Sequence, residues 1–205
     1  MLDRNVEIKT AEVIAVQHEN HLARRLVLAD GESVDFDHLT VAAGAWSKAL
    51  CAEVGDYVPL DSERGYATTI PDSHTSIRNL LLFPDDEFVA TPMSEGLRLG
   101  VTVELAGLDV PPNYRRTDLL VKTIVDYFPD IDTAVRDEWM GHRPSTPDGL
   151  PVISKSPSSN NVCYAFGHGH VGVTQSAITG ILLAQIVTGE RPDVDIELFS
   201  IQRFS

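Results

Sequence analysis

The chain has 205 residues, of which 43% are hydrophobic and 22% charged, and its formal net charge is −14. This negative charge argues against nucleic acid as a partner, because that affinity comes mainly from cationic side chains that displace counterions. The longest apolar-rich stretch, residues 178–187, is too short to span a bilayer. Cys51 and Cys163 form no CxxC pair and lie in apolar settings, which indicates two buried free thiols in a reducing compartment.

The first third of the chain alternates apolar and polar residues in short runs, as β-strands do. Residues 6–17 and 22–36, with a turn at Asp30-Gly31, predict an antiparallel meander. Residues 39–50 (LTVAAGAWSKAL) predict a buried strand, a glycine break and then a helix that begins near Trp46 or Ser47.

A second set of strands is expected in the middle of the chain, in residues 61–70, 79–83, 87–93 and 97–105. A helix should follow from Arg115 to Phe128, since its apolar residues share one face and Pro129 ends it. Residues 135–154 read as strand and turn, and residues 161–167 as another buried strand before a last helix that ends near Thr188. Strand-rich runs outnumber regular βαβ units, so the α+β class is predicted.

The segment AFGHGHVGVTQSAITGILLAQIVTG, residues 165–189, places histidines and glycines between a buried strand and a helix. A metal site built on His168, His170 and His142 is one interpretation, but no acidic or cysteine ligand neighbours them. Another is a hydrolase that uses Ser176 or Ser145 with a histidine and Asp148, although no GxSxG elbow is present.

A third interpretation is a ligand cradle, because a helix that follows glycines offers unpaired backbone N–H groups and a positive dipole end to an anion. The glycines allow a flat or charged ligand to approach the backbone closely. A tight strand-to-helix turn without any ligand is the remaining alternative.

Four blocks, in this order, resemble the C-terminal half of the FAD-dependent D-amino-acid oxidase-like family, which includes glycine oxidase, sarcosine oxidase and bacterial D-amino-acid dehydrogenases. They are LTVAAGAWS (39–47), PLDSERGY (59–66), GHRPSTPDGLPVIS (141–154) and YAFGHGHVGVTQSAITGILLAQIVTG (164–189) with its tail DIELFSIQRF (195–204). The resemblance implies an FAD-binding part in residues 1–58, a substrate-binding part in residues 59–140, and a return to the FAD-binding part in residues 141–205. The implied fold is an antiparallel substrate-domain sheet with helices, joined to the C-terminal remnants of a Rossmann-like FAD-binding domain.

The resemblance also implies FAD contacts. By position, the turn Ala43-Gly44-Ala45 resembles the loop that passes the flavin diphosphate, with Trp46 packing near the cofactor, and the strand from Val13 resembles the one whose backbone contacts the adenine. The glycine-rich loop resembles the one that faces the pyrimidine end of the isoalloxazine ring, where a helix N-terminus stabilises negative charge on the reduced flavin. Its residues are Gly167, His168, Gly169, His170, Val171, Gly172, Val173 and Thr174.

For the substrate, Arg143 resembles the arginine that clamps the carboxylate in glycine oxidase, a role that suits the guanidinium fork. Internal pairing of Arg143 with Asp148 is the alternative. Tyr66 is a weaker candidate for lining the substrate cavity, and His168 and His170 either contact flavin or substrate or satisfy local hydrogen bonds. The implied activity is oxidation of the Cα–N bond of a small or D-configured amino acid by hydride transfer to FAD, with oxygen or a quinone-linked carrier as the electron acceptor. An N-methyl amino acid is an alternative substrate.

The chain departs from the family at its start, since members begin with a strand, a GxGxxG turn and a helix. The glycines before Gly55 are Gly31 and Gly44, and neither belongs to such a motif. We therefore expect a fragment that binds FAD weakly or not at all by itself, with exposed strand edges that associate with the missing N-terminal half or with another copy. The alternative is a non-catalytic folded remnant that serves as an interaction module without FAD. The expected location is the cytoplasm, or the periphery of the inner membrane for a quinone-linked enzyme.

Overall fold

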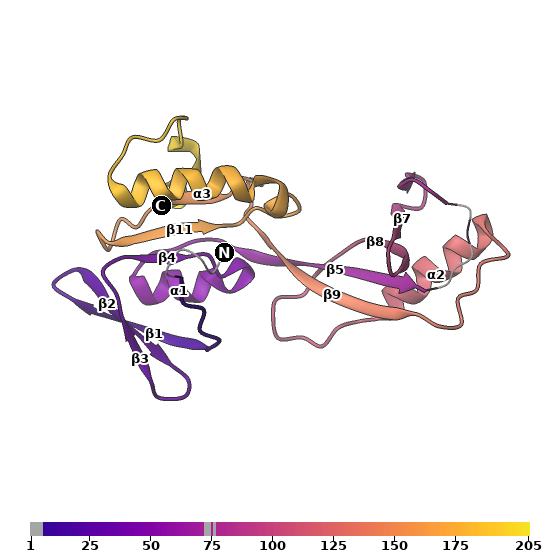
Figure 1. Ribbon diagram of the computed structural model, residues 1–205, viewed down its shortest axis with the longest axis horizontal. Helices are drawn as coiled ribbons and strands as arrows, with labels where there is room; N and C mark the ends of the chain where they lie inside the picture. The colour runs from indigo at the N-terminus through magenta and orange to yellow at the C-terminus, as the bar shows by residue number, and fades with distance from the viewer. Residues whose placement is uncertain (1–5, 72–74, 76) are drawn as a thin grey trace. The chain divides into compact units, whose positions relative to one another are not determined.

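The computed structural model describes residues 6–71, 75 and 77–205, and it divides the chain into two compact units (Figure 1). The first unit comprises Met1–Leu60 and Ser145–Ser205, and the second comprises Asp61–Pro144. Each unit has its own hydrophobic core, and each is described by itself below.

The first unit opens with the predicted antiparallel meander. Strands β1 (Val13–Glu19), β2 (Leu22–Leu28) and β3 (Ser33–Asp35) form a sheet in the order β1-β2-β3. Asn20 and His21 both have positive φ, as expected for a two-residue hairpin turn that matches the strand twist. The turn after β2 contains Gly31 at φ +87°, which confirms the expected turn at Asp30-Gly31.

A second sheet of the first unit has the order β10-β11-β4. Strand β10 (Val152–Lys155) pairs with β11 (Val162–Phe166) in the antiparallel sense, whereas β11 pairs with β4 (Leu39–Val41) in the parallel sense. A 3-10 turn, η2 (Gly44–Trp46), connects β4 to helix α1 (Ser47–Val54), so the helix begins where the sequence predicts. Helix α3 (Gly172–Thr188) follows β11, and the 3-10 turns η3 (Glu197–Phe199) and η4 (Ile201–Phe204) end the chain.

A buried carboxylate ties α1 to the β10–β11 hairpin. Asp56, which follows the C-terminus of α1, accepts hydrogen bonds from the hydroxyls of Ser156, Ser158 and Tyr164. Both cysteines are buried and free, as expected. Burial and, after it, the negative charge of Asp56 raise the pKa of the Cys51 thiol to about 12, so this thiol is protonated at neutral pH.

The second unit is a five-stranded sheet in the order β6-β7-β8-β5-β9 with one helix against it. Its strands are β5 (Asp61–Ile70), β6 (Leu81–Phe83), β7 (Phe88–Met93), β8 (Gly96–Leu105) and β9 (Asp137–Ser145). Helix α2 (Arg115–Tyr127) packs on β5 and β8, where Ile124 joins Ile70 and Leu99 in the core. Since β9 belongs to this sheet, Gly141–Pro144 lie in the second unit and the chain returns to the first at Ser145.

The observed architecture is a mixture of helices and largely antiparallel sheets, which agrees with the α+β expectation at that level. The predicted strands and helices are present. The first strand was expected from residue 6, but β1 begins only at Val13, because residues 6–12 have no ladder partner in the described part of the chain. None of the helices in the described part of the chain combines the length and the hydropathy that a membrane span requires.

Candidate functional site

The parallel pairing of β4 and β11 brings two sequence-predicted segments to one edge of a sheet. Val41 and Tyr164 are register partners, and Gly44 and Gly167 each follow three residues later. The carboxyl ends of parallel strands lie at the same edge, where open α/β sheets bind their ligands. The turn after β4 and the glycine-rich loop after β11 therefore flank a common region within the first unit.

The glycine-rich loop owes its path to two glycines. Gly167 has φ +81° and Gly169 has φ +51°, a left-handed conformation that side chains rarely adopt. A Cβ on Gly167 would also lie 3.1 Å from Cγ2 of Thr146. Backbone conformation and close packing thus both require glycine at 167.

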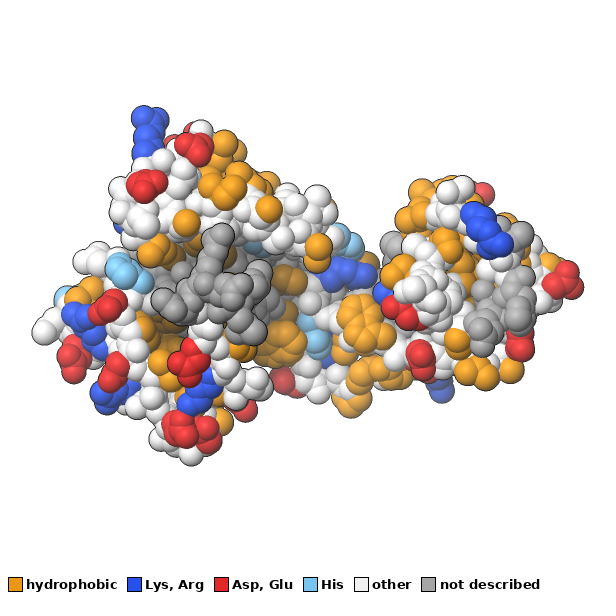
Figure 2. All heavy atoms as spheres, in the orientation of Figure 1, with side chains coloured by type: hydrophobic (Ala, Val, Ile, Leu, Met, Phe, Trp, Pro, Cys, Tyr) orange, Lys and Arg blue, Asp and Glu red, His pale blue; other side chains and the backbone are white. Residues whose placement is uncertain are grey.

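Helix α3 begins directly after this loop with an open N-terminus. The Val171 amide donates to the His168 carbonyl and the Gln175 amide to the Val171 carbonyl, so the first-turn amides between them have no acceptor within the helix. No side chain caps α3, and its first turn contains no acidic residue. Val173 is 92% exposed, and Figure 2 shows hydrophobic side chains on the outer surface of α3. The positively polarised end of α3 thus has neither a side-chain cap nor an acidic residue of its own first turn to offset it.

The two loop histidines differ in environment. His168 is partly buried and its Nε2 lies 3.0 Å from Oγ1 of Thr179, while burial lowers its pKa. His168 is therefore neutral at pH 7 and satisfies a local hydrogen bond. His170 is exposed on the same loop. In the described part of the chain, no group of three or more His, Cys, Asp or Glu residues is arranged to hold a metal ion.

The other predicted cofactor residues also lie in the first unit. Ala43 precedes η2, Gly44 has φ +56° with open space where a Cβ would be, and Trp46 is 55% exposed. Val13 opens β1, which has β2 on one side and lies at the edge of its sheet. The free edge of β1 leaves backbone groups available to a ligand.

The candidate substrate arginine lies in the second unit, on β9. The guanidinium of Arg143 lies directly over the backbone of Gly65 on β5, and a Cβ at 65 would overlap it. Its Nη1 donates to the Thr102 carbonyl over 3.4 Å. Burial lowers the pKa of Arg143, although the nearby Glu63 carboxylate acts in the opposite direction. Asp148, the alternative partner suggested by the sequence, accepts hydrogen bonds from Arg203 within the first unit.

Tyr66 points to the other face of the same sheet. Successive residues of a strand face opposite ways, and Tyr66 packs edge-on against Tyr114 beside α2. Its hydroxyl donates to the Glu104 carboxylate and accepts from the Asn113 amide. The hydroxyl of Tyr66 is therefore engaged within the unit, and the residue is buried. A substrate role for Tyr66 stays a prediction.

Three residues that the sequence did not single out share a face with Arg143. Arg98, Asp137 and Trp139 line a cavity of about 370 Å³ on the sheet surface that does not carry α2. Each comes from a strand end or edge, and only the pairing of β8, β5 and β9 brings them together. The residue types and their spacing in the sequence therefore could not predict this cavity.

A family model described as FAD dependent oxidoreductase matches residues 1–186 of the chain. The chain belongs to this family. Within the FAD dependent oxidoreductase family, it is 42% identical over 182 residues to a D-amino-acid oxidase of Bradyrhizobium diazoefficiens, covering 87% of this chain and 43% of that protein. It is 32% identical to a D-amino acid dehydrogenase of Xanthobacter autotrophicus, covering 94% of this chain and 46% of that protein. The chain thus spans less than half the length of these curated relatives.

Two solved structures share the fold of this chain. Glycine oxidase from Geobacillus kaustophilus superimposes with a TM-score of 0.80 at 22% identity, covering 94% of this chain and 52% of that one. Iminodiacetate oxidase from Chelativorans gives a TM-score of 0.78 at 22% identity, covering 94% of this chain and 53% of that one.

The residues present fit the family's cofactor. FAD carries a diphosphate and a ring whose reduced form is anionic, and the first unit offers backbone amides at the start of α3 with no competing acidic side chain. Gly44 has open space where a Cβ would be, so the backbone of the turn after β4 is open to close approach. Ala43, Gly44, Trp46 and the loop from Gly167 to Thr174 are the residues that would hold it.

Proposed function

We propose that the protein carrying this chain oxidises the Cα–N bond of an amino acid, giving an imino acid that water hydrolyses to a keto acid and an ammonium ion. When FAD is bound, it supplies the acceptor for the hydride that leaves Cα. In this proposal the first unit is the C-terminal part of a Rossmann-like FAD-binding domain, and the second unit is the substrate domain. The assignment of the first unit to a larger FAD-binding domain is supported by the apolar outer surface of α3. A helix that is apolar all round is normally covered by another part of the protein.

One observation carries the proposal, namely the position of Arg143. Its guanidinium lies over Gly65, on the face of the sheet opposite α2, and it is partly desolvated there. A desolvated guanidinium is a strong partner for a carboxylate, because it donates two parallel charge-assisted hydrogen bonds. Every amino acid carries that carboxylate, so Arg143 would bind the group common to all substrates and fix the orientation of Cα.

The proposal is tested with Arg143→Ala and Arg143→Lys in the FAD-loaded protein, assayed by amino-acid-dependent flavin reduction. Loss of the clamp should lower kcat/KM by about 100-fold or more, since removing one partner of a buried charge pair costs several kcal/mol. Arg143→Lys should recover only part of this loss, because an ammonium lacks the bidentate fork.

Arg115→Ala is the matched control, since Arg115 is an exposed arginine of the same unit at the start of α2. Its kcat/KM should stay within twofold of the parent value. Normal efficiency of Arg143→Ala on amino acids would remove the clamp role. A purified protein that takes up no flavin when FAD is added, judged by visible absorption, would favour the non-catalytic alternative.

A further inference from the structure

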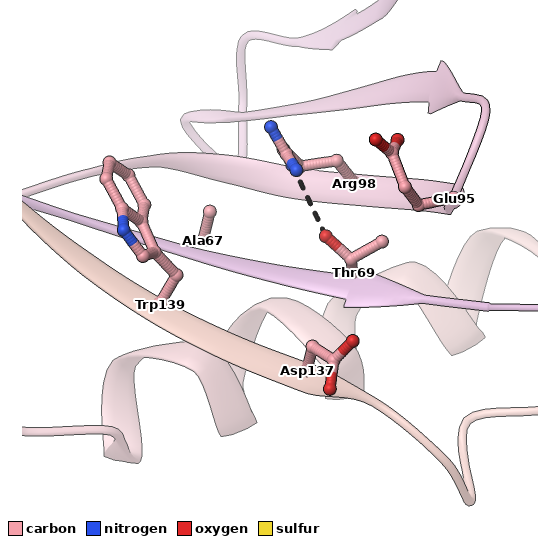
Figure 3. A pocket seen from close by; sticks show the side chains of 6 residues that line it. All are labelled: Ala67, Thr69, Glu95, Arg98, Asp137 and Trp139. Atoms are coloured by element: carbon pink, nitrogen blue, oxygen red, sulfur yellow. Dashed lines mark hydrogen bonds between the residues drawn. The ribbon is translucent and has the colours of Figure 1, made fainter.

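The sheet of the second unit is hollowed on the face opposite α2, farther along β9 than Arg143. The cavity of about 370 Å³ has Ala67 and Thr69 of β5 as its floor, with Arg98, Asp137 and Trp139 around it and Glu95 at one end. Figure 3 shows these side chains together, five of them from the neighbouring strands β8, β5 and β9 and Glu95 from the turn before β8. The lining is mostly apolar, but it carries charged groups at the end of β9 that is remote from Arg143.

The cavity and Arg143 lie along the same face of strand β9. Asp137, Trp139, Gly141 and Arg143 are separated by two residues each, so their side chains face the same way. The Trp139 indole lies over Gly141, where a Cβ would overlap it, and so extends along the strand toward Arg143. One face of one strand therefore presents a guanidinium, an indole surface and a carboxylate in that order.

The charges in the cavity do not cancel. Arg98 donates to Oγ1 of Thr69 over 3.3 Å, as the dashed line in Figure 3 marks. The lining has one guanidinium, that of Arg98, and two carboxylates, those of Glu95 and Asp137. The Asp137 carboxylate is exposed, and it has no hydrogen bond or ion pair to the part of the chain that the structure describes. A net negative charge therefore remains beside the Trp139 indole.

We propose that this cavity receives the substrate side chain and selects side chains that end in a cation, as in D-lysine, with Asp137 and Trp139 as the specificity-determining residues. This inference rests on the proposed function, in which Arg143 holds the α-carboxylate. The apolar floor at Ala67 and the indole would cover the methylene stem, while Asp137 and the indole face attract the ammonium group.

The spacing along the sheet suits such a ligand. The Arg143 guanidinium lies over Gly65, and the cavity ends near Thr69, so the two recognition points are separated by roughly 13 Å at 3.3 Å per residue. A four-carbon stem with hydrogen bonds at both ends covers a distance of that order, whereas the methyl group of alanine leaves the cavity empty. An acidic side chain is the competing choice, since Arg98 would attract it, but it would meet Asp137 and Glu95 as well.

The experiment compares D-lysine, D-norleucine, D-glutamate and D-alanine as substrates of the FAD-loaded protein and of its Asp137→Asn, Asp137→Glu and Asp109→Asn variants. D-Norleucine matches the stem of D-lysine without the charge. The parent protein should favour D-lysine over D-norleucine by about tenfold or more in kcat/KM. Asp137→Asn should lose this ratio by lowering kcat/KM for D-lysine more than for the other three substrates, and Asp137→Glu should keep part of the ratio. Asp109→Asn, a change at an exposed carboxylate elsewhere in the unit, should behave as the parent.

Each other outcome overturns the inference. A parent preference for D-glutamate would assign side-chain recognition to Arg98, and a parent preference for D-norleucine would make the cavity a purely apolar one. An Asp137→Asn variant that loses activity equally on all four substrates would show a structural role for Asp137. Turnover of D-alanine with no response to Asp137 would leave the proposed function standing, whereas no turnover of any amino acid would remove both.

Discussion

The backbone of Gly65 supports the guanidinium of Arg143, and this contact leaves no room for a side chain. We predict that Gly65→Ala displaces Arg143 and lowers kcat/KM for amino acids by about tenfold or more, because small misplacements of an orienting group are costly. The effect should appear mainly in KM if Arg143 binds the carboxylate of the ground state. Steady-state kinetics of the FAD-loaded variant measure it.

Gly100 of β8 provides the control for this change. A Cβ at 100 would meet Cβ of Ala67 at 3.7 Å, an ordinary van der Waals distance. Gly100→Ala should therefore change kcat/KM for D-alanine by no more than twofold. Equal losses in the two alanine variants would indicate a general disturbance of the sheet rather than displacement of Arg143.

Some of the candidate site residues could be predicted from the sequence, and others could not. Arg143 and the loop from Gly167 stand in motifs with family-specific spacing, so the sequence alone identifies both as candidates. Asp137, Trp139 and Arg98 are ordinary surface residue types, and their meeting depends on strands that are far apart in the chain. The partners of Tyr66 could not be foreseen either, because Glu104 and Asn113 reach it through strand pairing and a loop.

At the scale of elements, the loop before α3 contains a glycine that the fold requires, and α3 itself contains one that it does not. Gly167, before the helix, has φ +81° and a close contact to Thr146, whereas Gly180 lies inside the helix with open space around a Cβ. We predict that Gly167→Ala destabilises the protein by about 1–3 kcal/mol through backbone strain. Gly180→Ala should stabilise it by about 0.5–1 kcal/mol through helix propensity.

Urea unfolding followed by circular dichroism measures both changes. The pair also separates stability from cofactor binding, because Gly167→Ala should weaken FAD binding while Gly180→Ala should not. A Gly167→Ala variant with parent stability and parent FAD affinity would contradict the role assigned to this loop.

The elements themselves were predictable because each has a local signal. Alternation marks the strands, Pro129 follows the end of α2, and glycine follows α1 and α3, where Gly55 and Gly189 take positive φ. Sheet membership was not predictable in the same way. Periodicity does not show that β11 pairs in parallel with β4, nor that β9 joins the sheet of the second unit, since both pairings depend on contacts distant in sequence.

At the scale of the whole molecule, the two units have separate cores and should respond separately to core mutations. Asp56 is buried in the first unit with three hydroxyl donors, and Ile124 is fully buried in the second against β5 and β8. Replacing Asp56 by Ala leaves buried hydroxyls without their acceptor, at a cost of about 3 kcal/mol. Replacing Ile124 by Ala removes buried methyl groups at a cost of about 2–5 kcal/mol.

Amide hydrogen exchange with mass spectrometry on the protein carrying this chain distinguishes the two effects. Asp56→Ala should speed exchange in β10, β11 and α1 and leave β7 and β8 at parent rates, because local openings follow the cooperative units of a structure. Ile124→Ala should give the reverse pattern, with α2, β7 and β8 affected. If either variant accelerated exchange in both units to the same extent, the cores would unfold as one cooperative unit, and the division at Leu60 and Ser145 would describe geometry but not stability.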